Sequence, residues 1–200
     1  EKLNEAAVYD DVVKGKLNLE TLTADEKSEW QRVCNRMLEI CKVASEKNVG
    51  VMIDAEDSWI QHPVDALATN MMEQFNKDRA IVYNTAQLYR HDRLKYIQDV
   101  NHYAVNTGFK LAFKLVRGAY MEKERERALE KGYPSPINPD KESTDKMYND
   151  AVRYCVDPKN DMYTLVGSHN ENSNMLAAEL IEMYNLPFDT NRIYFSQLYG

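Results

Sequence analysis

The sequence predicts an α/β fold built from successive βα units. Five short apolar runs begin at Val49, Ala80, Leu111, Tyr163 and Ile193, at intervals of 31, 31, 52 and 30 residues, with amphipathic helical patterns between them. This spacing is typical of parallel strands, either in a (βα)8 barrel or in an open doubly wound sheet. No Gly-x-Gly-x-x-Gly follows any of the runs, which argues against a Rossmann dinucleotide site.

Composition excludes some classes of protein. The chain has 200 residues, enough for one domain or a large piece of one. Its formal charge of -7 disfavours a nucleic-acid surface, so small or cationic partners fit better. Cys34, Cys41 and Cys155 leave an odd thiol and form no C-x-x-C pair, which predicts a reducing compartment, by default the cytoplasm. No membrane span or export signal is expected.

The first elements lead into the repeating units. Residues 1–22 are charged and weakly periodic, and we expect a loop or one short helix there. Thr23 and Glu26 have the spacing of a capping box, in which each side chain bonds to the other residue's backbone amide. A long helix with one apolar stripe should follow, ending near Lys47.

Strands and helices then alternate. The expected strands are 49–54, 80–88, 111–116, 163–166 and 193–196, and the expected helices are 64–75, 93–106, 122–131, 143–156 and 173–184. The interval before the fourth strand is long because it holds a proline-rich loop, 133–139, and the extra helix 143–156.

Polar residues lie at or just after the carboxyl ends of several of the expected strands. They are Asp54 with Glu56, then Gln87, Lys114 and the segment Ser168–Asn170. Barrel enzymes place their sites at this carboxyl end of the sheet. Taken singly, each residue has a structural explanation: Asp54 or Asn170 could cap a helix, and Gln87 could satisfy a loop amide.

The third strand carries two cations, Lys114 and Arg117. Since side chains alternate along a strand, Lys114 and Val116 should point one way and Phe113, Leu115 and Arg117 the other. One cation is therefore expected to point into the core, where an ammonium needs an anionic or strongly polar partner. A bound ligand would supply it, although Lys114 could instead reach the rim and pair with a carboxylate such as Asp54.

The segment Lys114–Tyr120, with the sequence KLVRGAY, resembles the signature of proline dehydrogenase, the flavoenzyme that oxidises proline to pyrroline carboxylate. Supporting matches occur in the family's order at Ile53–Glu56, Gln87–Tyr89, Gly132–Pro134 and Ser168–Asn170. The similarity runs from about Val49 to Gly200, and the combination is far more specific than any single motif.

The resemblance decides between the two architectures in favour of the barrel. It implies a (βα)8 TIM-barrel, of which this chain would supply roughly strands two to six, with an extra helical insertion after the third strand of the chain. Residues 1–200 would then be a partial barrel, with a loop or short helix at 1–22, a leading helix at 23–47 and βα units at 49–200.

The resemblance also implies the chemistry and the residues that carry it. In the family, proline gives a hydride to FAD and quinone later takes up the electrons. The positions matching cofactor contacts are Gln87, Lys114, Val116, Gly118, Thr144, His169 and Asn170. The positions matching substrate contacts are Asp54, Leu115 and Tyr120. The expected catalytic residues are Lys114, Asp54 and Tyr120, and no metal is expected.

The sequence also departs from the family. The family binds the substrate carboxylate with an arginine pair, helped by a lysine on its first strand and a late tyrosine, but this sequence contains no Arg-Arg. We therefore expect a piece of the enzyme that self-associates on its own, because its sheet would have two open edges. For the full-length enzyme, peripheral contact with the inner membrane stays open.

Two other functions remain open. The chain could be a catalytically silent barrel fragment. Less favoured is a flavin-free barrel lyase or metal-assisted hydrolase, whose candidate residues are Asp54, Glu56, His91, Asp92 and His169. Adjacent His91 and Asp92 do not have the spacing of a usual metal site.

Overall fold

The computed structural model describes residues 2–5, 7–187 and 190–199. Its chain divides into two compact units. The first unit contains residues 1–84 and 102–111, and the second contains residues 85–101 and 112–200. Strand β2 and helix α5 contribute residues to both units.

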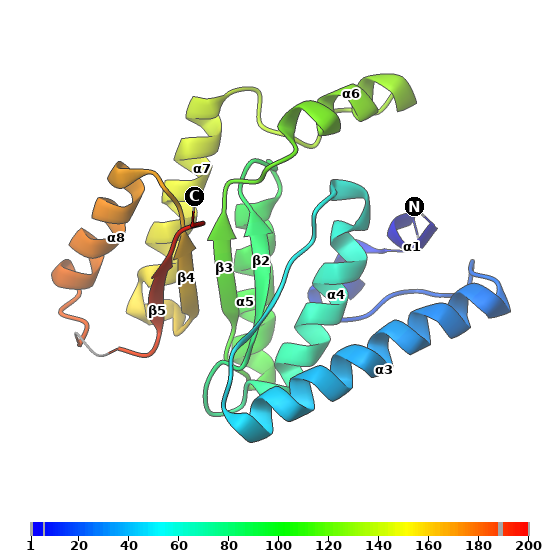
Figure 1. Ribbon diagram of the computed structural model, residues 1–200, viewed down its shortest axis with the longest axis horizontal. Coiled ribbons are helices and arrows are strands. Elements are labelled where there is room, and N and C mark those ends of the chain that lie inside the picture. Colours follow the sequence, from blue (N-terminus) through cyan, green and yellow to red (C-terminus); the bar gives the residue numbers. More distant parts are fainter. Residues whose placement is uncertain (1, 6, 188–189, 200) are drawn as a thin grey trace. The chain divides into compact units, whose positions relative to one another are not determined.

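The elements alternate as the sequence predicts (Figure 1). The helices are α1 (Lys2–Glu5), α2 (Tyr9–Val13), α3 (Ala24–Lys47), α4 (Ser58–Phe75), α5 (Arg93–Thr107), α6 (Met121–Lys131), α7 (Lys141–Val156), the 3-10 helix η1 (Pro158–Asn160) and α8 (Glu171–Met183). The strands are β1 (Val51–Ile53), β2 (Val82–Gln87), β3 (Ala112–Val116), β4 (Tyr163–Gly167) and β5 (Ile193–Ser196).

In the first unit, β1 pairs in parallel with β2, with Val51 opposite Val82. Helices α1, α2 and α3 all pack on α4. The buried side chain of Asn76, just after α4, accepts hydrogen bonds from the amides of Ile81 and Val82 and donates to the carbonyls of Val82 and Lys110. All these bonds are between 2.8 and 3.0 Å, so this one amide fixes where β2 begins relative to α4.

In the second unit, β3 pairs in parallel with β4, and β4 pairs in parallel with β5. Just after β2, the Leu88 amide donates to the Val116 carbonyl at the end of β3. Among the described strands, each recorded pairing joins strands that are consecutive in the sequence. A doubly wound sheet requires a reversal of strand order, so this order favours the barrel type of sheet.

Helices cover one face of the strands of the second unit. The Phe113 ring packs edge-on against Tyr96 of α5, with ring centroids 6.1 Å apart. Helix α7 packs on β3, β4 and α8, and α7 and α8 run beside β4 and β5 in Figure 1. The buried Tyr148, Val152 and Ala177 fill this layer. The other face of these strands is left without a helix from the described part of this unit.

Most element predictions are confirmed, and apart from α4 their boundaries shift by at most two residues. The capping box at Thr23 and Glu26 is present in full, and the expected extra helix follows the proline-rich loop as α7. The largest error is at α4, which was predicted to begin at Val64. The helix begins at Ser58 instead and holds Pro63 in its second turn. Within residues 2–22, two short helices form where one at most was expected.

The long helix α3 is less buried than its apolar stripe predicts. Only Cys41 is fully buried, and Ile40 is exposed. None of the described helices is both long and apolar enough to cross a bilayer.

Candidate functional site

Strand β3 presents two chemically different faces. Phe113 packs against α5, and the Arg117 guanidinium lies over the ring of Tyr148 in α7, so the helix-facing set is Phe113, Leu115 and Arg117. Because side chains alternate, Lys114 and Val116 point to the opposite face. Both are half-buried, whereas Phe113 and Leu115 are fully buried. The predicted division of the strand is therefore confirmed.

The face that carries Lys114 continues onto neighbouring strands. A Cβ built on Gly167 of β4 would lie 3.2 Å from Val116 Cγ1, so these two residues adjoin on this face. Gln87, the buried last residue of β2, comes immediately before Leu88, whose amide donates to the Val116 carbonyl at 2.8 Å. A cation, an amide and two small apolar positions thus lie near the carboxyl ends of these strands.

Gly118 turns the chain away from β3 in a conformation that other residues rarely adopt. Its φ is +112°, and a Cβ at this position would lie 2.5 Å from the Tyr89 ring. Tyr89 is fully buried, and its amide donates to the Arg117 carbonyl at 2.6 Å. The ring and the backbone of Gly118 are therefore in close contact, and the glycine is required by both sterics and φ.

Leu115 and Tyr120 are placed differently from Lys114. Leu115 lies on the helix-facing side of β3, so the structure does not bring it to the Lys114 face, where a substrate contact was expected. Tyr120 is half-buried at the N-cap of α6, and Lys123 lies 5.4 Å from the centroid of its ring.

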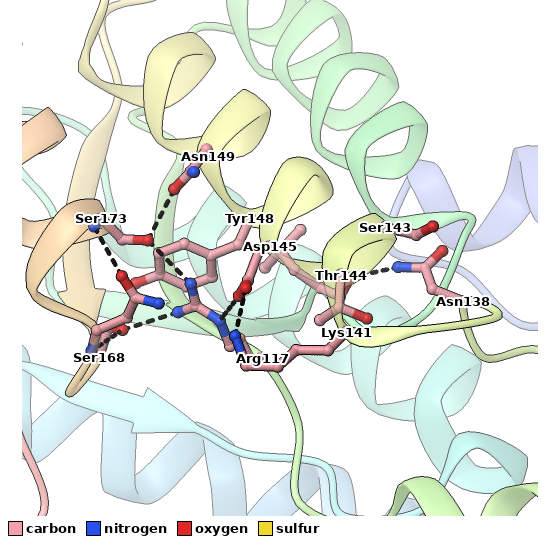
Figure 2. Close-up of polar contacts among 12 residues, drawn as sticks. Arg117, Asn138, Lys141, Ser143, Thr144, Asp145, Tyr148, Asn149, Ser168 and Ser173 are labelled. Atoms are coloured by element: carbon pink, nitrogen blue, oxygen red, sulfur yellow. Dashed lines mark hydrogen bonds and ion pairs between the residues drawn. The ribbon is translucent and has the colours of Figure 1, made fainter.

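Arg117 is the centre of a polar cluster on the helix-facing side (Figure 2). Its Nε donates to Asp145 Oδ1 at 2.6 Å, Nη1 to Ser168 Oγ at 2.8 Å and Nη2 to Ser173 Oγ at 2.9 Å. The guanidinium carbon lies 4.2 Å from the centroid of the Tyr148 ring. One side chain thus joins the end of β3 to α7, to the residue after β4 and to the first turn of α8.

Two ionisable groups of this cluster have shifted pKa values. Burial raises the pKa of Tyr148 to about 12, so its ring stays neutral beside Arg117 at physiological pH. Burial alone would raise the pKa of Asp145, but hydrogen bonds from Lys141 and Arg117 outweigh it and hold the pKa below its usual value. The carboxylate therefore stays ionised and paired with Arg117.

The proline-rich loop attaches to the end of β2. The buried Asn138 side chain donates to the Leu88 carbonyl at 3.0 Å, and the Asn138 backbone amide donates to the Tyr89 carbonyl at 2.6 Å. Arg125 of α6 donates to the carbonyls of Asn138 and Pro139. These contacts hold the loop beside the segment that follows Gln87.

Three further predicted contacts follow the loop and β4. Thr144 is buried in α7, and its hydroxyl donates to the Asp140 carbonyl at 3.1 Å. His169 is exposed just after β4. Asn170 is the N-cap of α8 and accepts from the Ser173 amide at 3.1 Å, which confirms the structural alternative for this residue.

Asp54 lies in the first unit, exposed, directly after β1. Of the residues suggested for a metal-assisted hydrolase, Asp92 is held by two arginines, since Arg90 and Arg93 each donate to both of its oxygens. A carboxylate compensated in this way is a poor metal ligand. In the described part of the chain, no group of three or more His, Cys, Asp and Glu side chains has metal-binding geometry.

Comparison with known proteins identifies the family. A family model described as proline dehydrogenase matches residues 2–200. The chain belongs to the proline dehydrogenase family.

Curated members of the proline dehydrogenase family are similar along most of the chain. Human mitochondrial proline dehydrogenase 1 is 33% identical over 204 residues, covering 100% of this chain and 34% of the relative. The Caenorhabditis elegans protein of the same name is 33% identical over 187 residues, covering 91% of the chain and 30% of the relative. The carbapenem antibiotics biosynthesis protein CarD of Pectobacterium carotovorum is 33% identical over 183 residues, covering 90% and 46%. The chain thus spans less than half the length of these relatives.

Solved structures show the same fold. Proline utilization A from Bdellovibrio bacteriovorus, in a form inactivated by N-propargylglycine, superposes with a TM-score of 0.78 at 22% identity, covering 87% of this chain and 18% of that one. Proline utilization A from Corynebacterium freiburgense gives 0.72 at 18% identity, covering 88% and 19%. The five parallel strands therefore match a barrel domain, while their numbering as strands two to six stays a prediction.

Arg117 and Asn138 were not singled out from the sequence as residues that hold together the ends of β2, β3 and β4. A usable signal existed for Arg117: alternation places it on the helix-facing side, where a guanidinium needs acceptors, and Asp145, Ser168 and Ser173 are polar residues in the adjacent segments. Asn138 gave no comparable signal, because its partners are backbone atoms of a distant segment.

Proposed function

We propose that the full-length protein is an FAD-dependent proline dehydrogenase that oxidises L-proline to pyrroline-5-carboxylate and passes the electrons to quinone. Family membership over residues 2–200 supports this proposal. The observation that carries it is the half-buried Lys114 on the face of β3 that is opposite to the helices. Cytoplasmic location and self-association of the isolated chain remain parts of the proposal.

The residues on this face fit a flavin chemically. A flavin has a flat apolar ring system whose edges need hydrogen-bond donors and acceptors. Val116 and Gly167 provide a surface without bulky side chains, Lys114 provides a charged donor, and the Gln87 amide can both donate and accept. His169 lies exposed after β4, where it adds a further polar group.

We assign tasks in the proposed reaction to five residues. When bound, FAD supplies the hydride acceptor for the proline ring carbon next to nitrogen. Lys114 would donate a hydrogen bond to the edge where negative charge develops, which stabilises the transition state more than the ground state. The backbone of Val116 and Gly118 would lie against the cofactor. Asp54 and Tyr120 are proposed to support and line the substrate position.

Thr144, Asn170 and Leu115 have weaker claims to direct contact. The hydroxyl of Thr144 bonds to its own helix, and Asn170 caps α8. Leu115 is fully buried on the helix-facing side. We assign these three residues to the support of the site, and we place the clamp for the substrate carboxylate outside this chain.

The test of this function is product formation by the full-length protein. Incubation with L-proline and an electron-accepting dye should reduce the dye and form pyrroline-5-carboxylate, detected as its coloured adduct with o-aminobenzaldehyde. Dye reduction without the adduct would indicate that L-proline is oxidised to a different product. Absence of both, with FAD bound, would support the catalytically silent alternative.

A further inference from the structure

We propose that Arg117 is a positioning residue, which holds the two strand-end segments 116–118 and 168–170 in place for the flavin from the opposite side of the sheet. This inference rests on the proposed function, because that function assigns Val116, Gly118 and His169 to the cofactor. Arg117 itself points away from the proposed cofactor face, so it acts through the backbone that it holds.

The guanidinium reaches three acceptors on three different segments. Asp145 is in α7, Ser168 follows β4 and Ser173 is in the first turn of α8, and all three bonds are between 2.6 and 2.9 Å (Figure 2). The Arg117 side chain is 22% exposed, and Tyr148 covers one face of the guanidinium. Partial exclusion of water strengthens these charge-assisted bonds.

Both serines connect Arg117 to the segment that carries His169, Ser168 through its hydroxyl and Ser173 through its backbone amide. Ser168 Oγ also accepts from the Asn170 amide at 3.0 Å. Ser173 Oγ donates to Asn149 Oδ1 at 2.7 Å, while the Ser173 amide donates to the Asn170 cap. Arg117 therefore orders both residues that flank His169, together with the beginning of α8.

The same residue also fixes the other segment. The Arg117 carbonyl accepts from the Tyr89 amide, and the Val116 carbonyl accepts from the Leu88 amide. The backbone of 116–118 is thus held by the end of β2 on one side and by the Arg117 side chain on the other. A lysine could not replace this arrangement, since one ammonium lacks the planar fork that reaches three separated acceptors.

Arg192 offers a matched control. Its Nε and Nη2 donate to the Met162 carbonyl at 3.2 and 3.1 Å, and its side chain is 28% exposed. Arg192 lies just before β5, and Met162 lies just before β4. The hydrogen bonds of Arg192 therefore connect the amino ends of β4 and β5, whereas Arg117 contacts the residue after the carboxyl end of β4. If Arg117 only stabilises the fold, replacing either arginine by methionine should weaken FAD binding to a similar extent.

The experiment compares Arg117→Met with Arg192→Met in the full-length protein by FAD titration and by the visible spectrum of the bound flavin. We expect Arg117→Met to weaken FAD binding about ten-fold or more and to change the spectrum. Arg192→Met should leave both nearly unchanged. Arg117→Lys should recover little of the affinity. Equal affinities and spectra in the two methionine variants would overturn the inference.

A second readout needs no cofactor. In the FAD-free protein, hydrogen exchange at the backbone amides of Asn170 and Ser173 should be faster in Arg117→Met than in Arg192→Met.

Ser173→Ala serves if Arg117→Met does not fold. It removes one of the three acceptors of Arg117, so it should speed hydrogen exchange at Asn170 and weaken FAD binding. Unchanged exchange and affinity in Ser173→Ala would then overturn the inference. Failure of the unmutated protein to bind FAD would instead refute the proposed function, and the exchange rates would still decide whether Arg117 orders these segments.

Discussion

Replacing Lys114 by Met in the full-length protein is expected to slow flavin reduction by L-proline by about 100-fold or more, which is the usual cost of losing one preorganised donor to a developing charge. Methionine has a similar length and no charge, so packing should change little. Lys114 is half-buried on the face away from the helices, and its replacement leaves the Phe113 contact with Tyr96 intact. Stopped-flow absorbance at saturating proline measures the rate.

Two control variants test whether the effect comes from the cationic donor at position 114 or from the loss of any lysine. Lys114→Arg keeps a cationic donor and should retain most of the rate. Lys146→Met removes a lysine whose side chain is 77% exposed and pairs with Asp150 on the surface of α7, and it should reduce flavin at the unmutated rate. If Lys114→Met also reduces flavin at the unmutated rate, Lys114 has a structural role alone.

Gly118→Ala should cost about 3 kcal/mol of unfolding free energy and should weaken FAD binding. A residue with a Cβ is strained at a φ of +112°, which costs about 1–2 kcal/mol. The added carbon would lie 2.5 to 2.6 Å from three atoms of the Tyr89 ring, and such overpacking costs about 1–3 kcal/mol more. The buried ring has little room to move, because Asn138 and Arg117 hold the backbone of its residue.

Gly132→Ala isolates the backbone contribution. Gly132 ends α6 with a φ of +72°, and a Cβ there would meet no atom within 4 Å. Urea unfolding of both FAD-free variants should therefore show a loss of about 1 kcal/mol for Gly132→Ala and a clearly larger loss for Gly118→Ala. If the two variants lose equal unfolding free energy, the Tyr89 ring moves to make room for the added methyl group. The close contact between Gly118 and Tyr89 would then contribute nothing to the cost of Gly118→Ala.

The order of elements could be predicted from the sequence because each strand is an apolar run and each helix has a clear period. Strand β3 is the best example: alternation alone separated Lys114 from Arg117, and the packing of Phe113 and Arg117 confirms it. The start of α4 could not be predicted. Proline is most often found in the first turn of a helix, but Pro63 lies in the second turn of α4, because the turn before it is helical and partly buried.

The contacts that assemble the site depend on residues far apart in the sequence. Arg117 and Ser173 are 56 residues apart, and Asn138 and Leu88 are 50 apart. No local pattern encodes such pairs, so the sequence supplied the candidate residues but not the cluster that supports them. Leu115 is a different case: the resemblance implies a substrate contact, whereas strand alternation already places its side chain on the helix-facing side, where it is fully buried.

The visible spectrum of the full-length protein loaded with FAD, recorded during anaerobic addition of L-proline, tests the proposed function most directly. The band of oxidised flavin should disappear with L-proline, persist with an equal concentration of L-alanine, and disappear far more slowly in Lys114→Met. A protein that stays colourless after incubation with FAD, or one whose flavin band is unchanged by L-proline, would contradict the proposed function.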